Sequence, residues 1–445
     1  MVNSSIVKGL AEMPVFRLGR TDRESFEAFQ NDPITFHLRA FRKLGPAYRT
    51  WFGDRMQVVL AGPEANDFIW KNGHLWSYAV ANALLLDEMG DDHVPALDGA
   101  HHLQKRTVLK AAFDQAPARR FLPQFNAGFR EALDDAAAKG SPVDLILFWT
   151  HTITRINTRT VARADMPDDA IPPLMRWQHQ MLRGQFLDDA SRPCVEREEY
   201  RVLKAHAFSW LYRIVDERLA NPGAHDDNFE ATLRARSELE GGKPDRDRLA
   251  NDLYLILVAG TENTANFIRW ATVFAYTSPK WLGALRAELQ GWDGADIQVL
   301  AKLPVLKAIL METLRVGPRS GGLTKHCVRD FEFGGYTIPA GTDITYPHVL
   351  GHFMEEFYPE PFTFNPARFL DSGRFVPRTQ GIFGGGTHIC LGRNHTLMQS
   401  PLALAQLVKH FDLEFARPPV FDVRVGNASS RLDEEVSARL IPCRG

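Results

Sequence analysis

The chain has 445 residues, of which 44% are hydrophobic and 24% charged, and its formal net charge at pH 7 is −2. These values exclude a disordered protein, and the near-neutral charge gives no electrostatic case for binding nucleic acid. The four cysteines lie far apart, at Cys194, Cys327, Cys390 and Cys443. They form no zinc-binding pair, and such sparse use fits a reducing, cytoplasmic compartment. The first 22 residues contain no long apolar run, so we expect neither a signal peptide nor a membrane anchor.

The N-terminal part is predicted to combine helices with a small sheet. Apolar residues at helical spacing predict a helix over 23–44, which Gly45-Pro46 ends. Residues 47–52 and 56–61 predict two strands joined by a turn at 53–54, and a short helix is expected over 63–71. Residues 74–95 show no clean periodicity. We therefore expect a long, partly apolar loop there, and long ordered loops are more often functional than not.

The middle of the chain is predicted to be helical. Helices are expected over 98–113, 124–139, 142–164, 172–187 and 196–220, with prolines between several of them. Segment 175–186 is rich in methionine and aromatic residues, which fits core packing and a flexible lid over an apolar substrate equally well. Residues 246–277 predict one very long helix, in which Gly260 costs about 1 kcal/mol relative to alanine. A closely approaching ligand or a helix bend is therefore expected at its centre.

The C-terminal part is predicted to mix strands with two further helices. The helices are expected over 303–316 and 391–411, and the strands over 325–328, 331–338, 342–346 and within 413–440. Residues 357–380 have little regular pattern. The elements together predict a mainly α fold with a smaller β-rich region.

A glycine run and a cysteine stand out before the last predicted helix. Gly384, Gly385 and Gly386 leave a backbone that another group can approach closely. Cys390 precedes the helix, where free N–H groups and the helix dipole favour a thiolate. A turn with a buried structural cysteine is the simpler explanation. A thiolate in a glycine-lined loop also suits a soft metal within a flat cofactor.

The complete string Phe-X-X-Gly-X-X-X-Cys-X-Gly, from Phe383 to Gly392, resembles the haem-binding loop of the cytochrome P-450 family of haem-thiolate monooxygenases. The resemblance is to the soluble bacterial type. It implies one domain over 1–445, a long central helix over the haem, and haem b whose iron is bound by Cys390. It also implies that Phe383 packs beside the cysteine, that Gly386 lets the loop pass under the haem, and that His388 meets a haem propionate.

Two further groups of residues match the family in the expected order. His102 and Arg106 share one helix face, which alone is typical of a solvated surface, but the resemblance implies that both hold a haem propionate. Lys325 lies where the family often has a propionate-binding arginine, and a lysine would bind as a point charge.

The second group is expected to brace the cysteine loop. Glu312 and Arg315 lie three apart on one helix face, a pattern that alone is an ordinary surface ion pair. The resemblance implies that the pair is internal and is completed by Arg368, in the Asn-Pro-Ala-Arg-Phe string at 365–369.

The centre of the long predicted helix departs from the family pattern. By resemblance, the stretch from Ala259 and Gly260 through Glu262 forms an oxygen-binding groove. Asn263 replaces the expected threonine. An amide donates two hydrogen bonds but cannot relay a proton through a hydroxyl. Thr264 lies about 100° further round the helix, so it should not simply substitute.

The resemblance implies an enzyme that uses O₂ and two electrons to oxidise a small lipophilic molecule, such as a terpenoid, a fatty acid or another secondary metabolite. Electrons are expected from a separate ferredoxin or flavodoxin system that docks near Arg374, Arg378 and Arg393. Two alternatives remain open. One is a peroxide-driven or non-oxygenating haem-thiolate enzyme, suggested by Asn263, and the other is a haem-binding sensor or carrier without turnover.

Overall fold

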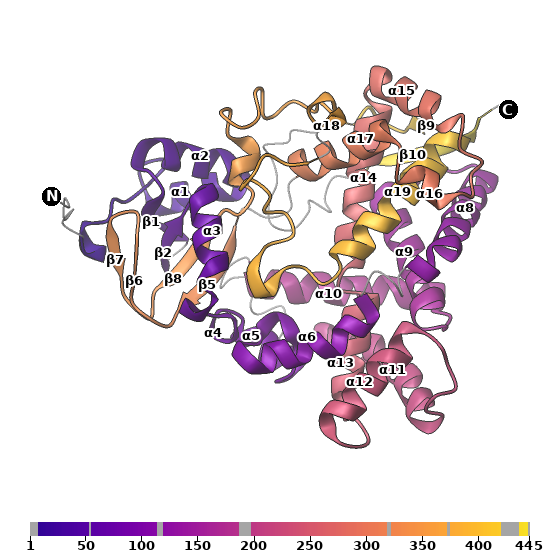
Figure 1. Ribbon diagram of the computed structural model, residues 1–445, viewed down its shortest axis with the longest axis horizontal. Coiled ribbons are helices and arrows are strands. Elements are labelled where there is room, and N and C mark those ends of the chain that lie inside the picture. Colours follow the sequence, from indigo (N-terminus) through magenta and orange to yellow (C-terminus); the bar gives the residue numbers. More distant parts are fainter. Residues whose placement is uncertain are drawn as a thin grey trace.

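The protein combines a mainly helical region with a small sheet region, and the two lie at opposite ends of the view in Figure 1. The computed structural model describes residues 8–52, 55–113, 119–186, 197–317, 322–371, 374–419 and 436–443. The predicted turn at 53–54, Cys194 and most of 413–440 lie outside these residues. The mainly α fold class with a smaller β-rich region is confirmed.

A five-stranded sheet has the strand order β1-β2-β8-β5-β3. Its strands are β1 (Ala47–Phe52), β2 (Arg55–Leu60), β3 (Trp76–Ser77), β5 (Leu323–Cys327) and β8 (Asp343–Tyr346). β2 pairs with β8 in parallel and β5 with β8 in antiparallel orientation, so strands from distant parts of the sequence lie side by side. Smaller sheets pair β6 (Phe331–Phe333) with β7 (Tyr336–Ile338), and β10 (Ser437–Pro442) with both β4 (Val143–Asp144) and β9 (Phe411–Phe415).

Two predictions in the N-terminal part are corrected. The single helix expected over 23–44 is two helices, α1 (Asp22–Asn31) and α2 (Pro33–Leu44). The Asp32 side chain accepts the Thr35 N–H and Pro33 occupies the first turn, so a new helix starts there. The loop expected over 74–95 contains α4 (Tyr78–Ala81) and α5 (Ala83–Met89), because Leu85 and Met89 pack into the main core.

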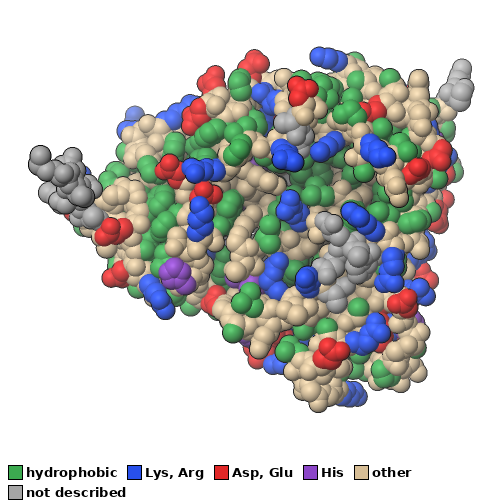
Figure 2. Space-filling view, viewed as in Figure 1, with side chains coloured by type: hydrophobic (Ala, Val, Ile, Leu, Met, Phe, Trp, Pro, Cys, Tyr) green, Lys and Arg blue, Asp and Glu red, His purple; other side chains and the backbone are tan. Residues whose placement is uncertain are grey.

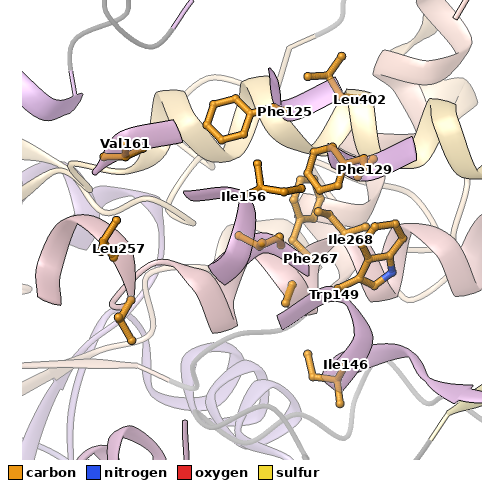
Figure 3. Close-up of a cluster of buried hydrophobic side chains, with 14 of the residues drawn as sticks. Phe125, Phe129, Ile146, Trp149, Ile156, Val161, Leu257, Phe267, Ile268 and Leu402 are labelled. Carbon is orange, nitrogen blue, oxygen red and sulfur yellow. The ribbon is translucent and has the colours of Figure 1, made fainter. Parts of the chain in front are cut away.

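The helical region surrounds one large apolar core. Figure 3 shows part of it, with side chains from α8 (Leu122–Lys139), α9 (Leu145–Val161), α13, α14 and α19 (Arg393–His410) directed toward one another. Phe129 and Trp149 are fully buried and meet edge to face, with ring centroids 6.1 Å apart. Burying such a side chain contributes roughly 1.5–3 kcal/mol, so this core holds the surrounding helices in place.

The very long helix predicted over 246–277 is interrupted. It consists of α13 (Arg246–Leu257) and α14 (Thr261–Tyr276). At the break, the N–H groups of Val258 and Ala259 both donate to the Tyr254 carbonyl, at 2.8 and 3.2 Å. The Thr261 hydroxyl donates to the Leu257 carbonyl at 2.8 Å, which satisfies a helix end inside the protein.

The remaining helices complete the helical region. They are α3 (Pro63–Lys71), α6 (Gly99–Phe113), α10 (Ile171–Phe186), α11 (Glu198–Ala220), α12 (Asn228–Glu240), α15 (Pro279–Leu289), α16 (Ile297–Leu300), α17 (Pro304–Val316) and α18 (Ala367–Leu370). The sequence patterns had not indicated α12, α15, α16 or α18. In the described part of the chain, no helix combines the length and apolar character needed to cross a membrane.

Candidate functional site

The loop before α19 is shaped by its contact with α3. Gly384 and Gly386 adopt positive φ values of 66° and 63°, which favour glycine. A Cβ atom at Gly385 would overlap the Trp70 indole, and one at Gly386 would lie 2.7 Å from the Trp70 carbonyl oxygen. The glycine run is therefore required by packing against Trp70 within the protein, a contact that the sequence did not reveal. Beside Gly392, in contrast, no atom of the described residues other than its own chain neighbours lies within 4 Å of where a Cβ would be.

Cys390 lies in a recess at the end of this loop. Its N–H donates to the Phe383 carbonyl at 2.9 Å, which places half-buried Phe383 beside the cysteine. The thiol is accessible, yet burial by the surrounding atoms raises its pKa despite hydrogen bonds from the Gly392 and Arg393 N–H groups. The N–H groups of the helix N-terminus thus favour the thiolate, and burial opposes it. A metal cation at the sulfur would reverse the balance, because metal coordination deprotonates a thiol.

A column of basic and aromatic side chains, here called the basic column, lies beside the loop. The His388 ring stacks on His102 of α6 at 3.6 Å and on Tyr78 of α4 at 3.3 Å between ring centroids. The Lys325 ammonium of β5 lies 3.6 Å from the Tyr78 ring centroid in a cation–π contact. Arg106 of α6 donates to the Ile389 carbonyl at 2.9 Å. The fold thus gathers the four predicted propionate-binding residues around the cysteine loop, and Tyr78 joins them.

The basic column is poorly solvated. Burial lowers the pKa of Lys325 to about 7, that of His102 to about 4 and that of His388 to about 3. Asp98 opposes the lowering at Lys325 and His102. Its carboxylate also accepts hydrogen bonds from the Tyr78 N–H and the Ser77 hydroxyl, both at 2.6 Å.

The donor set of this arrangement fits haem. An accessible sulfur with two N–H donors suits an axial metal ligand, and basic groups that burial pushes toward neutrality suit added carboxylates. Among the described residues, no three His, Cys, Asp or Glu side chains cluster as a metal site. An iron held by one thiolate therefore needs the additional ligands that a porphyrin provides.

A buried ion network lies behind the loop. Glu312 and Arg315 of α17 are fully buried and form a two-point contact, with Nε–Oε2 and Nη2–Oε1 distances of 2.7 and 2.8 Å. Arg368 of α18 approaches Glu312 with its Nε 3.4 Å from Oε1. The structure thus brings the three predicted members together inside the protein, where the sequence pattern alone would have suggested a surface pair.

The same network binds the backbone that leads to the cysteine loop. Arg315 donates to the carbonyls of His352 and Pro361 at 2.7 Å and of Thr363 at 3.2 Å. Glu312 accepts the Asn365 N–H at 2.9 Å. The segment 352–365 has no long helix or strand. These side chains therefore provide hydrogen-bond partners for its backbone groups, which a helix or strand would otherwise provide.

The break between α13 and α14 forms the other part of the candidate site. Gly260 and Asn263 are exposed, although most of α14 is buried. The Thr264 hydroxyl lies 2.9 Å from that of Thr396 in α19, and this contact joins α14 to the helix that follows Cys390. Ala259 is half-buried at the break.

Glu262 belongs to a chain of polar contacts that reaches α10. The Gln178 amide donates to a Glu262 carboxylate oxygen at 3.2 Å, and the Tyr254 hydroxyl donates to the Gln178 oxygen at 3.1 Å. Gln178 and Tyr254 are buried. The sequence patterns did not indicate this chain, because its members come from three helices.

The comparisons with known proteins agree with this architecture. The family described as Cytochrome P450 matches residues 26–424. The chain is 34% identical over 426 residues to Cytochrome P450 734A5 of Oryza sativa subsp. japonica, covering 86% of this chain and 77% of the relative. It is 24% identical over 396 residues to Putative cytochrome P450 120 of Synechocystis sp., covering 86% and 87%.

Solved structures share the fold. A cytochrome P450 described as CYP102L1 superposes with a TM-score of 0.80 at 22% identity, over 98% of this chain and 100% of the other. A likeness at this identity establishes the fold. The family match and the rice relative carry the assignment further: the chain belongs to the cytochrome P450 family of haem-thiolate monooxygenases, which hold haem iron through a cysteine.

Proposed function

We propose that this cytochrome P450 oxidises a small lipophilic molecule, such as a terpenoid, a fatty acid or another secondary metabolite, with Cys390 as the iron ligand. The observation that carries the proposal is the cysteine recess beside the basic column. Cys390 receives two backbone N–H bonds, and His102, Arg106, Lys325 and His388 converge on the same loop.

The residues would hold the haem from two directions. Cys390 would bind the iron, and the four basic side chains would pair with the propionates, which restores the charge that burial opposes. When bound, haem supplies the oxygen-activating chemistry, and a thiolate ligand favours O–O cleavage. Phe383 lies beside the cysteine, and the Gly392 and Arg393 N–H groups would stabilise a thiolate.

Glu262 and Asn263 would take part in proton delivery at the break between α13 and α14. Glu262 is held by Gln178, which lies against Tyr254, so its carboxylate has a defined resting position. Asn263 is exposed at the break, and its amide offers donors and an acceptor to an oxygen atom or to an oxygenated substrate. Among the described residues, no side chain or loop other than the neighbouring chain lies within 4 Å of where a Cβ at Gly260 would be, which leaves room for a small ligand.

The substrate class is supported by the surrounding helices. Met181 and Trp177 of α10 are buried and apolar, and Leu85 of α5 joins the same core. A cyanobacterial CYP120A1 described as bound to retinoic acid has the same fold, with a TM-score of 0.79 at 21% identity over 97% of this chain and 100% of the other. Long, largely apolar molecules are therefore the first to test.

We further propose that electrons arrive from a separate ferredoxin or flavodoxin system. On the face drawn in Figure 2, lysine and arginine side chains surround the central hollow. Arg393 follows the cysteine loop, and Arg378 is largely exposed near Asp67, at 3.4 Å. Cations near the thiolate side favour an acidic partner.

The test is a screen of lipophilic molecules against purified holoprotein. Binding is read as a change in the haem absorption spectrum, and each binder is then incubated with O₂, a ferredoxin, its reductase and NADPH. An oxygenated product from a binder supports the proposal. Binders that are never oxidised with any reductant contradict it.

A peroxide-driven reaction is the second candidate, and Asn263 is the observation that favours it. An amide at this position cannot relay a proton through a hydroxyl. Product formation with hydrogen peroxide alone, and none with O₂ and reductant, would select this candidate. The Asn263→Thr variant is the matched control, because it restores a hydroxyl at the same place.

A further inference from the structure

A second buried ion network lies under α6, outside the residues discussed above. Lys105 is 1% exposed, and its ammonium contacts Asp92 at 2.6 Å and also Asp252. Arg236 is equally buried and binds both carboxylates at 2.6 Å. The Nη1 atom of Arg236 contacts the Glu240 carboxylate at 2.7 Å. The network joins α6, α12, α13 and the segment that follows α5.

The charges in this network depend on one another. Burial acts to raise the pKa of Asp92, but Lys105 and Arg236 hold it below its usual value. Burial raises the pKa of Asp252 despite the same two cations. Removing one cation would leave the Asp252 carboxylate in low dielectric with a single partner, whereas Asp92 also contacts His101 at 3.0 Å. Leaving Asp252 in this way is strongly unfavourable. The four groups therefore fix the relative positions of the elements that carry them.

The position of Lys105 on α6 connects this network to two residues of the same helix that face the cysteine loop. His102, Lys105 and Arg106 lie within little more than one helical turn. His102 stacks on His388, and Arg106 binds the Ile389 carbonyl, so these two face the cysteine loop. Lys105 lies between them in sequence and faces α12 and α13. A rotation of α6 about its axis would break both sets of contacts together.

The segment before α6 is held in the same way. The Glu88 carbonyl accepts from Lys204 of α11 at 2.6 Å, and Asn251 of α13 binds the Met89 carbonyl. Asp92 then enters the network. The chain is thus anchored shortly before α6 begins, which limits how far the helix can shift along its axis.

We infer that Lys105, through its contacts with Asp92 and Asp252, is a positioning residue that sets His102 and Arg106 against the haem. This rests on the proposed haem contacts of those two residues. Lys105 acts through α6, in the way that residues behind a metal ligand orient that ligand.

The experiment compares Lys105→Met, Lys105→Arg and Lys110→Met holoproteins. Lys110 is exposed on the same helix, so its substitution is the matched control. Haem release to excess apomyoglobin is followed together with the reduced carbonyl spectrum and the haem reduction potential. Lys105→Met should release haem roughly 10–100-fold faster, the range found for residues that orient metal ligands. Lys105→Arg should recover most of the retention, and Lys110→Met should match the wild type.

Arg106→Ala separates the positioning role from the haem contact itself. Fast haem release from Arg106→Ala with wild-type release from Lys105→Met overturns the positioning role and leaves the haem contact standing. Wild-type release from both variants overturns the haem contact as well. A lower melting temperature for Lys105→Met with unchanged haem release and potential shows a structural role only, and overturns the inference.

Asp92→Asn is the second variant, for use if Lys105→Met does not fold. It keeps the size of the side chain, and Lys105 retains Asp252. A smaller acceleration of haem release in the same direction supports the inference, and wild-type release contradicts it.

Discussion

The loop that carries Cys390 and the break between α13 and α14 are held by different kinds of contact. The loop is fixed by protein contacts at nearly every step: glycines packed on Trp70, the Cys390 N–H bonded to Phe383, and the Glu312–Arg315 pair holding the preceding backbone. At the break, Gly260 and Asn263 are exposed.

The difference separates two requirements of a cytochrome P450. On the proposed assignment, the cysteine loop would bind the iron and needs one geometry, which its packing on Trp70 and the Glu312–Arg315 pair help to fix. The break would face oxygen and substrate and needs space and a few adaptable polar groups. Four residues test this contrast, beginning with the one whose replacement is the most disruptive.

Cys390→Ser should abolish thiolate ligation of the haem iron by the cysteine loop. A serine oxygen is a poor replacement for a thiolate, so the ferrous carbonyl band typical of thiolate-ligated haem should disappear. The reduced carbonyl spectrum measures this. Cys443→Ser, at a partly exposed cysteine, is the control and should keep the band. Survival of the band in Cys390→Ser would exclude Cys390 as the ligand.

Glu312→Ala should weaken haem binding by the cysteine loop, because it removes a contact that holds the backbone before the loop. The change leaves Arg315 buried without its carboxylate, which costs about 3–5 kcal/mol for a broken buried pair. Haem content after purification and urea unfolding measure the loss. Glu414→Ala removes an exposed pair with Arg439 and should change neither quantity measurably. A normal haem content in Glu312→Ala would contradict the bracing role.

Lys325 should make haem affinity depend on pH. Burial lowers the pKa of this ammonium to about 7, so above that pH it is neutral before haem binds. A neighbouring propionate favours the charged form and raises the pKa, so haem binding takes up a proton between the two pKa values. Affinity should therefore fall as the pH rises above about 7, by at most about tenfold per unit for one proton.

Haem titration of the apoprotein at several pH values measures this dependence. Lys325→Arg remains charged throughout and should flatten the profile while retaining affinity. Lys325→Met should flatten it and weaken binding. A wild-type profile in Lys325→Met would show that another group is responsible.

Asn263→Ala should have the smallest effect on structure, because the side chain is exposed at the open side. Haem content and melting temperature should be unchanged, while a larger share of the electrons should be lost to peroxide. The ratio of product to NADPH consumed measures this. An unchanged ratio would mean that the amide takes no part in proton delivery. Gly260 and Glu262 would then be the remaining residues at the break that distinguish it from the cysteine loop.

The cysteine loop was easier to predict from the sequence than the break between α13 and α14. The string from Phe383 to Gly392 indicated a haem loop because its spacing is specific, and the strands at 47–52 and 342–346 followed their alternation. Gly260 predicted a ligand or a bend at this place but not a complete break, since the helical pattern of α13 continues into α14 without a proline. Local periodicity does not report where two hydrogen bonds converge on the Tyr254 carbonyl.

Residue types and their spacing along the chain were enough to indicate the family, the mainly helical fold and the residues that surround the cysteine. Contacts between distant segments were needed to show that Trp70 shapes the glycine run, that Tyr78 joins the basic column and that Lys105 faces two buried carboxylates. Packing and attraction between these partners stabilise the contacts, and a low local dielectric strengthens the attraction between paired charges. No local pattern records these contacts, because the partners meet only when the chain has folded.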